Sequence, residues 1–381
     1  MMKLYSITIM YFILLLYIPF IIITSVKAGR SFIVISDFTT STEIDNLPYK
    51  SSITDLIQSI SPITVGNDGT VNTGPDWPLS NIVNQAHGNG TKIWTSLKLA
   101  SASDFLMNNN KNTFQMVSKN VINLLKIAKY DGIQFDIEGL KFNVKDKYED
   151  FVKAFSETLA TDRNSQIEFS TTYYGIKLLE NEHAPTAYNI SKLSSFGNIF
   201  IMAYDMSWYG LKPKFGWKQA SPNAPLNGLQ ALVKNAINRK VNPGKLILGL
   251  PLYGRIYICD GEESNDQYGN CTCKEKNFKK KSLDILNNIW QDESNGCNLG
   301  YNEISATPFW ECNNYENKQQ RTQGWFENSK SLNLKINLAS NKQLMGIGAW
   351  TAHGIAGGTK FDSNIWNLIT KYILEGVTNK K

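Results

Sequence analysis

The chain has few of the residues that bind metals or nucleic acids. Its three histidines, His87, His183 and His353, lie far apart in the sequence, and Cys271-Thr272-Cys273 does not have the spacing of a zinc knuckle. The net charge is +6, without the clusters of Lys and Arg that are typical of nucleic-acid binding. We therefore expect no metal, no cofactor and no nucleic-acid partner.

Long apolar runs are absent after the first 28 residues. That leader carries Lys3, a nearly unbroken apolar run and then Val26-Lys27-Ala28, where small residues mark a signal-peptidase site. A membrane anchor is the alternative, since residues 7–25 are nearly long enough to span a bilayer. The small-residue site favours cleavage before Gly29, which leaves a mature chain, residues 29–381, without an anchor. Loss of the two lysines of the leader lowers the net charge to +4.

The cysteines and the Asn-X-Ser/Thr tripeptides suit a secreted chain. All five cysteines fall in one stretch of about fifty residues, which predicts local disulfides in an oxidising compartment. We expect two bridges and one remaining thiol, with the pairing left open. N-glycosylation acceptors stand at Asn89, Asn189 and Asn270. The expected destination is the secretory pathway and the lysosome, with the extracellular space as the alternative, and we expect a monomer.

Eight short β-like runs recur along the chain, with helix-like stretches such as 117–128 and 229–237 between them. The runs are 31–35, 63–65, 92–95, 133–137, 167–171, 199–202, 246–249 and 345–350. Strand and helix alternating eight times are typical of a (β/α)8 TIM barrel, an α/β fold whose catalytic groups sit at the C-terminal ends of the strands. We expect the long gap before the last run, about 259–325, to be a cysteine-containing insertion between strands 7 and 8. The lysines between Lys276 and Lys281 are interpreted as a solvated edge without a function.

The fourth run ends in two carboxyls on one face. Apolar residues at 133, 135 and 137 alternate with Gln134, Asp136 and Glu138, which fits a strand better than a helix. Two acids held together away from water do not both ionise readily, so one pKa rises and a proton stays available near neutral pH. An acidic strand end in solvent is the alternative, but the flanking apolar residues indicate a buried setting. The motif therefore predicts a general acid.

Residues 131–138, Asp-Gly-Ile-Gln-Phe-Asp-Ile-Glu, resemble the D-G-x-D-x-D-x-E signature of the family-18 glycoside hydrolases, the chitinases and their relatives. Gln134 stands where the family usually has Asp or Asn. Met202-Ala203-Tyr204-Asp205 is similar to the family's M-x-Y-D segment, residues 249–255 to its G-x-P-x-Y-G-R run, and Gly346–Trp350 to its glycine-rich approach to a tryptophan. Core packing could explain each aromatic singly, but four motifs at four strand ends in the family's order favour a sugar site.

Within the family the resemblance is greatest to the chitobiase branch, which trims chitobiose cores from the reducing end. It rests on Asn223-Ala224-Pro225, Tyr257-Ile258-Cys259 and residues 324–328, and it covers roughly residues 90–355. The segment 96–100, Ser-Leu-Lys-Leu-Ala, lacks the S-x-G-G pattern of typical chitinases. That absence points away from a long-chain endochitinase.

The resemblance implies a retaining glycosidase for β-1,4-linked N-acetylglucosamine, in chitobiose cores of glycoprotein oligosaccharides or in chitooligosaccharides. It makes Glu138 the acid that protonates the glycosidic oxygen, with Asp136 and Tyr204 acting on the acetamido group of the substrate. The acetamido oxygen is then the nucleophile, which is substrate-assisted catalysis. The expected substrate-binding residues are Gln134, Met202, Asp205 and Trp350. An endo-acting chitinase and a non-catalytic chitin-binding lectin remain the alternatives, and the amide of Gln134 predicts an acid-shifted pH optimum.

Overall fold

The computed structural model describes residues 29–75, 77–162, 165–180, 186–207, 217–259, 271–274, 278–289, 291, 294, 296–313 and 321–375. The expected leader and the acceptor Asn270 lie outside the described residues. Within the described part, no helix combines the length and the apolar character needed to cross a membrane.

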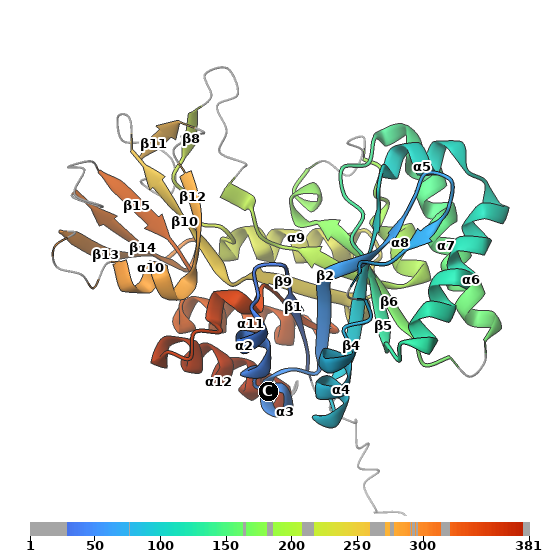
Figure 1. Ribbon diagram of the computed structural model, residues 1–381. Helices are drawn as coiled ribbons and strands as arrows, with labels where there is room; N and C mark the ends of the chain where they lie inside the picture. Colours follow the sequence, from blue (N-terminus) through green and yellow to red (C-terminus); the bar gives the residue numbers. More distant parts are fainter. Residues whose placement is uncertain are drawn as a thin grey trace, which may run out of the picture.

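Eight parallel strands close into a barrel, which confirms the expected (β/α)8 fold (Figure 1). They are β1 Arg30–Ile35, β2 Asp55–Val65, β4 Lys92–Leu99, β5 Gly132–Phe135, β6 Glu168–Tyr174, β7 Asn198–Met202, β9 Leu246–Pro251 and β16 Gly346–Trp350. Their order is β1-β16-β9-β7-β6-β5-β4-β2, and pairing of β2 with β1 completes the circle. The second strand begins at Asp55, well before the expected start at Ile63, and a register shift after Gln58 bends it. A short strand, β3 Val71–Asn72, pairs with its end.

Helices follow the strands and cover the outside of the barrel (Figure 1). They are α2 Ser41–Asp45, α3 Tyr49–Ser52, α4 Ser80–Gly88, α5 Ala102–Asn108, α6 Lys111–Ile127, α7 Lys145–Thr161, α8 Ile190–Phe196, α9 Leu226–Asn238, α11 Ser329–Asn341 and α12 Lys360–Glu375. The helix α6 illustrates why they form. The Asn110 side chain caps its first turn by accepting from the amides of Asn112 and Thr113. Buried residues at 114, 117, 121 and 125 give it one apolar face against the barrel.

The barrel is filled rather than hollow. Its interior holds an apolar cluster of Phe32, Val34, Ile57, Trp94, Phe200 and Ile247. Gly132 leaves the space that the Trp94 ring occupies, because a Cβ there would lie 2.4 Å from that ring. At the N-terminal end of the strands, Arg30 donates to Asp55 at 2.9 Å and to Glu168 at 2.7 Å. These paired charges fill that end of the barrel. Space for a ligand is therefore left at the opposite end.

The chain between β9 and β16 forms an antiparallel sheet. This sheet lies on the side of the barrel away from α5 to α8 (Figure 1). Its strands are β10 Tyr253–Ile258, β12 Phe278–Ser282, β13 Cys297–Asn302, β14 Thr307–Cys312 and β15 Thr322–Trp325, with α10 Leu283–Ile289. Two further strands, β8 Trp217–Gln219 and β11 Thr272–Lys274, pair with each other. The sheet begins at Tyr253, ahead of the expected boundary at Cys259.

Two disulfides tie this insertion, as expected from the cysteine count. The pairs are Cys259 with Cys271 and Cys297 with Cys312. The second pair joins directly opposed residues of β13 and β14. Cys273 is buried and belongs to neither disulfide. The pairing that the sequence left open is thus local along the chain, with sequence separations of 12 and 15.

Candidate active site

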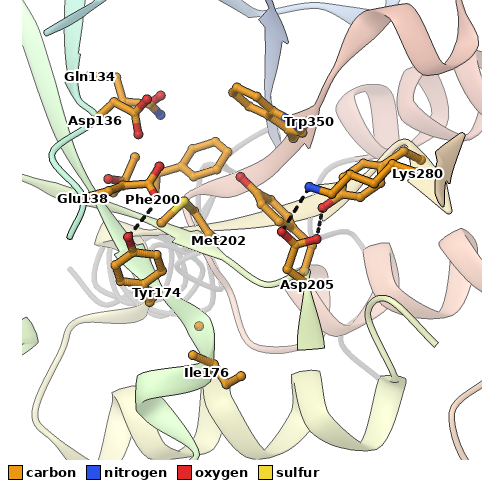
Figure 2. Close-up of a pocket in the computed structure, with 14 residues that line it drawn as sticks. Gln134, Asp136, Glu138, Tyr174, Ile176, Phe200, Met202, Asp205, Lys280 and Trp350 are labelled. Atoms are coloured by element: carbon orange, nitrogen blue, oxygen red, sulfur yellow. Dashed lines mark hydrogen bonds and ion pairs between the residues drawn. The ribbon is translucent and has the colours of Figure 1, made fainter. Parts of the chain in front are cut away.

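A cavity of about 450 Å³ opens at the C-terminal ends of the barrel strands. Its lining includes all seven of the expected catalytic and substrate-binding residues, Gln134, Asp136, Glu138, Met202, Tyr204, Asp205 and Trp350. Thr172, Tyr174, Gly175, Ile176, Phe200, Tyr253 and Lys280 complete it. Figure 2 shows Asp136, Glu138 and Trp350 around the same space. The fold therefore brings together side chains from positions 134 to 350 of the sequence.

The acidic segment leaves the strand earlier than expected. The strand β5 ends at Phe135, so the prediction of a strand through Ile137 is wrong at its end. The amide of Asp136 still donates to the carbonyl of Leu97 at 2.9 Å, but tyrosine hydroxyls then replace the sheet partners. Tyr188 Oη donates to the Ile137 carbonyl at 3.0 Å. The two carboxyls therefore lie on a loop that side chains hold in place.

Glu138 is oriented by a residue that the sequence did not reveal. Tyr174 Oη donates to Glu138 Oε2 at 2.8 Å and accepts from the amide of Gly139 at 3.2 Å (Figure 2). Gly139 has φ +68°, a left-handed conformation that costs glycine least. Burial is the main cause that raises the pKa of Tyr174, followed by its bond to Glu138, so the hydroxyl keeps its proton. The alternation of side chains along β6 could have revealed Tyr174. Ser170 pairs with Gln134, and Tyr174 lies four residues after Ser170, so it points to the same face of the sheet as Gln134.

Asp136 is the carboxyl with the strongly altered pKa. Its side chain is 11% exposed, and burial together with the nearby Glu138 raises its pKa to about 6. The ammonium of Lys98, on β4, lies 3.5 Å from Asp136 Oδ2 and opposes that rise. Gln134 is buried next to Asp136 (Figure 2). The raised pKa thus belongs to Asp136, two residues before Glu138.

Tyr204 follows β7 and supplies a hydroxyl to the cavity. Burial raises its pKa well above the ordinary value, and the nearby Tyr253 and Asp136 add to the effect. The hydroxyl therefore stays protonated over the whole physiological range. Its ring meets that of Tyr253 edge-on, with centroids 6.3 Å apart. A protonated hydroxyl in this position can donate a hydrogen bond to an oxygen of a ligand.

Asp205 is held by groups from the insertion. Tyr253 and Arg255, both on β10, donate to Asp205 Oδ1, and Lys280 of β12 lies 3.4 Å from Oδ2 (Figure 2). Burial would raise the pKa of Asp205, but Arg255 and Lys280 lower it below its usual range. The Asn223 side chain accepts from the Asp205 amide at 2.7 Å, where the backbone has φ +60°. Asp205 is thus a fixed carboxylate that is already paired with cations.

Lys280 adds to our interpretation of the lysine run. The lysines of β12 lie on an edge strand of the sheet, and Lys279 and Lys280 are exposed, as expected. Lys280 also lines the cavity, and its ammonium lies 5.0 Å from the centre of the Tyr253 ring. The pairing of β12 with β10 brings it there, with Lys280 opposite Arg255. This cross-strand contact within the insertion cannot be read from a run of like charges.

A second cavity of about 490 Å³ adjoins the first. Tyr253, Lys280 and Trp350 line both cavities, so the two spaces meet at these side chains. Phe38 and Ile285 give the second cavity apolar surface, and they are 71% and 44% exposed. Flat apolar surface of this kind suits the faces of sugar rings. The two cavities together can hold more than one sugar unit.

Two of the three expected glycosylation acceptors lie at helix ends. Asn89 follows α4, and its side-chain amide donates to the Gln85 carbonyl at 2.8 Å. Asn189 caps α8 by accepting from the amide of Lys192 at 3.3 Å. Both side chains are half-buried. No group of three or more metal-ligating side chains occurs among the described residues.

Comparison with known proteins places this site in a family. The model of the glycosyl hydrolases family 18 matches residues 37–354. The chain is 24% identical over 279 residues to di-N-acetylchitobiase of Homo sapiens, covering 67% of each chain. It is 26% identical over 244 residues to di-N-acetylchitobiase of Mus musculus, covering 61% of this chain and 63% of the relative.

Solved structures show the same fold. The Group IV chitinase of Ostrinia furnacalis, in complex with allosamidin, superposes with a TM-score of 0.68 at 16% identity, over 91% of this chain and 99% of the chitinase. The GH18 chitinase of Cycas revoluta, in complex with (GlcNAc)3, superposes with a TM-score of 0.69 at 14% identity, over 90% of this chain and 99% of the chitinase. The family model and the curated relatives confirm the glycosidase expected from the motifs at the level of the family. The chain belongs to the glycosyl hydrolases of family 18 and is related to the di-N-acetylchitobiases.

Proposed function

We propose that the protein is a retaining glycoside hydrolase that cleaves β-1,4-linked N-acetylglucosamine by substrate-assisted catalysis, with the specificity of a chitobiase. The observation that carries the proposal is the distribution of carboxyls in the cavity. Asp136 and Glu138 come from one loop, and the third carboxyl, Asp205, is engaged by Arg255 and Lys280. Among the described residues, no further carboxyl lines the cavity from the opposite side, where a carboxylate nucleophile acts in other retaining glycosidases.

The acetamido group of the substrate supplies the nucleophile in this proposal. Glu138 gives its proton to the glycosidic oxygen as the bond from that oxygen to C1 breaks. The acetamido carbonyl oxygen bonds to C1 and forms an oxazolinium ion. The resulting Glu138 carboxylate then takes a proton from water as the water oxygen attacks C1. The bond from C1 to the acetamido oxygen breaks, which opens the oxazolinium ring. The configuration at C1 is thus retained, and Glu138 is protonated again.

Two residues of the cavity act on the acetamido group. The Asp136 carboxylate accepts from its N–H and stabilises the positive charge that develops there. The protonated hydroxyl of Tyr204 donates to its carbonyl oxygen and aligns it with C1. Trp350, on the strand β16, offers an apolar surface to the sugar ring, and Met202 and Gln134 complete the pocket.

Product analysis tests the proposal and separates it from its alternatives. The purified protein is incubated with chitotriose and with a free glycan that ends in a chitobiose core, with Glu138→Gln as the control. Either cut of chitotriose yields one monosaccharide and one disaccharide, so the reducing end of the substrate carries a label. A label in N-acetylglucosamine supports a chitobiase, whereas a label in the disaccharide indicates an endo-acting chitinase. Binding without turnover indicates a lectin. Proton NMR of the first product tests retention, because a fresh α-anomer contradicts the mechanism.

The second candidate, an endo-acting chitinase, is favoured by one observation. The cavity that adjoins the active site provides room for further sugars beyond Trp350. A lectin is less well supported, because the chain keeps Glu138, Asp136 and Tyr204 together in one cavity. We also propose passage through the secretory pathway to the lysosome, with glycans at Asn89, Asn189 and Asn270. N-terminal sequencing and glycosidase treatment of the native protein test this route, and a retained leader or unmodified Asn contradicts it.

A further inference from the structure

Lys98 occupies a special place beside the acidic loop. The strands β4 and β5 run in parallel with Ser96 opposite Gln134. Lys98 and Asp136 each follow two residues later, so both lie on the inner face of the barrel. Their side chains meet there, with 3.5 Å between Lys98 Nζ and Asp136 Oδ2. The third strand thus places a cation directly next to the carboxyl that is to act on the acetamido group.

Position 134, two residues before Asp136, carries an amide and no acid. Gln134 is 3% exposed, and its Nε2 has no hydrogen-bond partner among the described residues. An Asp at this position could share a proton with Asp136, but an amide cannot. The charge balance of Asp136 must therefore be set by other groups.

The groups that face Asp136 come from several elements. They are Glu138 from the same loop, Lys98 from β4, Tyr204 after β7, Tyr148 from α7 and Tyr188 before α8. Burial raises the pKa of each tyrosine, which keeps them neutral. In this set Glu138 is the other carboxyl, and Lys98 is the cation. The ionisation of Asp136 therefore depends on the balance between these two.

We propose that Lys98 is a positioning residue that holds Asp136 as an oriented carboxylate and takes the place of the acid missing at position 134. The inference rests on the proposed function, because it concerns how Asp136 acts on an acetamido group. With Oδ2 turned toward Lys98, Oδ1 is left to accept from the acetamido N–H. Lys98 acts through Asp136 and has no contact with the substrate of its own in this scheme.

The sign of the expected effect follows from charge. Burial and Glu138 raise the pKa of Asp136 to about 6, and Lys98 opposes them. Removal of the ammonium leaves that rise unopposed, so the pKa of Asp136 moves higher. The acidic limb of the kcat profile then moves to higher pH, because Asp136 must be ionised. A shift of one pH unit lowers kcat about tenfold on that limb.

Lys98→Met and Lys98→Arg test the proposal, with Lys126→Met as the matched control. Lys126 has a similar exposure and pairs with Asp162, away from the cavity. We expect Lys98→Met to move the acidic limb up by about one pH unit and to change kcat more than KM. Lys98→Arg restores the profile, and Lys126→Met leaves it unchanged. An unmoved profile in an active Lys98→Met variant overturns the proposal.

A second measurement does not depend on turnover. Carbon NMR of labelled aspartates follows the titration of Asp136, whose signal is assigned by its loss in Asp136→Asn. A higher pKa of Asp136 in Lys98→Met supports the role of Lys98, and an unchanged pKa overturns it. If the wild-type protein cleaves none of the substrates, the proposed function fails, while this titration still decides the Lys98–Asp136 pair.

Discussion

Tyr174 Oη donates a 2.8 Å hydrogen bond to Oε2 of Glu138, and so β6 orients the acid that follows β5. The same hydroxyl accepts from the amide of Gly139, the next residue after the acid. One side chain thus fixes both the carboxyl and the backbone that carries it. Positioning of this kind matters for proton transfer, because small displacements of a general acid lower the rate steeply.

We expect Tyr174→Phe to lower kcat about tenfold while KM changes less, because loss of this hydrogen bond lets the general acid leave its productive position. Tyr49→Phe is the control, since Tyr49 Oη is buried without a partner in the described residues and lies outside the cavity. Steady-state kinetics on chitotriose provide the measurement. Equal losses in both variants would show that the Tyr174 hydroxyl has no special role.

We expect Glu138→Gln to reduce kcat by about 10²–10⁴-fold, because the amide fills the same space but has no acidic proton. Binding of chitotriose, measured by titration calorimetry, stays within about threefold of the wild type, since binding does not require proton transfer. Full activity in this variant removes Glu138 from the mechanism.

We expect Lys280→Met to raise KM several-fold with little change in kcat, because Lys280 completes the wall of the pocket beside Asp205 and Tyr253. Its side chain is 53% exposed, so the ion pair adds little to stability and Tm stays nearly constant. Lys279→Met is the neighbouring control, because Lys279 lines neither cavity. A matching rise of KM in both variants argues for a general charge effect instead.

The raised pKa of Asp136 predicts how Asp136→Asn changes stability with pH. The native pKa of about 6 exceeds the ordinary 3.8, so ionisation of Asp136 works against folding. Its contribution to stability is fully present below about pH 4 and is lost as the pH rises through about 6. We expect the variant to gain stability relative to the wild type over this range, by on the order of 3 kcal/mol at pH 8.

Urea unfolding of the wild type and Asp136→Asn at pH 4 and pH 8 checks this expectation. Glu157→Gln serves as the control, because this carboxyl forms only a helical pair with Lys153 on the surface. A difference between wild type and Asp136→Asn that is the same at both pH values contradicts a raised pKa at Asp136.

Local sequence patterns were enough to predict the barrel. In β7, for example, Ile199, Phe200 and Ile201 are all buried, so both faces of the strand are covered, and this burial is visible in the sequence as a short apolar run. The end of β5 was harder to predict, because the apolar alternation continues to Ile137. Its hydrogen-bond partner there is the Tyr188 hydroxyl, about fifty residues later in the chain.

The site was predicted wherever one strand carried its own motif. Asp136 and Glu138 stand two residues apart, so their proximity follows from local geometry. The residues that contact these and the other acidic side chains of the cavity could not be predicted. Tyr174, Lys98 and Lys280 reach the site because their strands pair with other strands. Register between distant segments is a property of the assembled sheet, which a single run of residues does not encode.

The two walls of the pocket come from different parts of the molecule. The proton donor and its companion Asp136 belong to the barrel, whereas Tyr253, Arg255 and Lys280 reach Asp205 from the antiparallel sheet. Exchange of loops in that sheet can therefore change the Asp205 side of the pocket while the loop that carries Asp136 and Glu138 stays on the barrel. The insertion thus offers a place to vary one wall of the cavity alone.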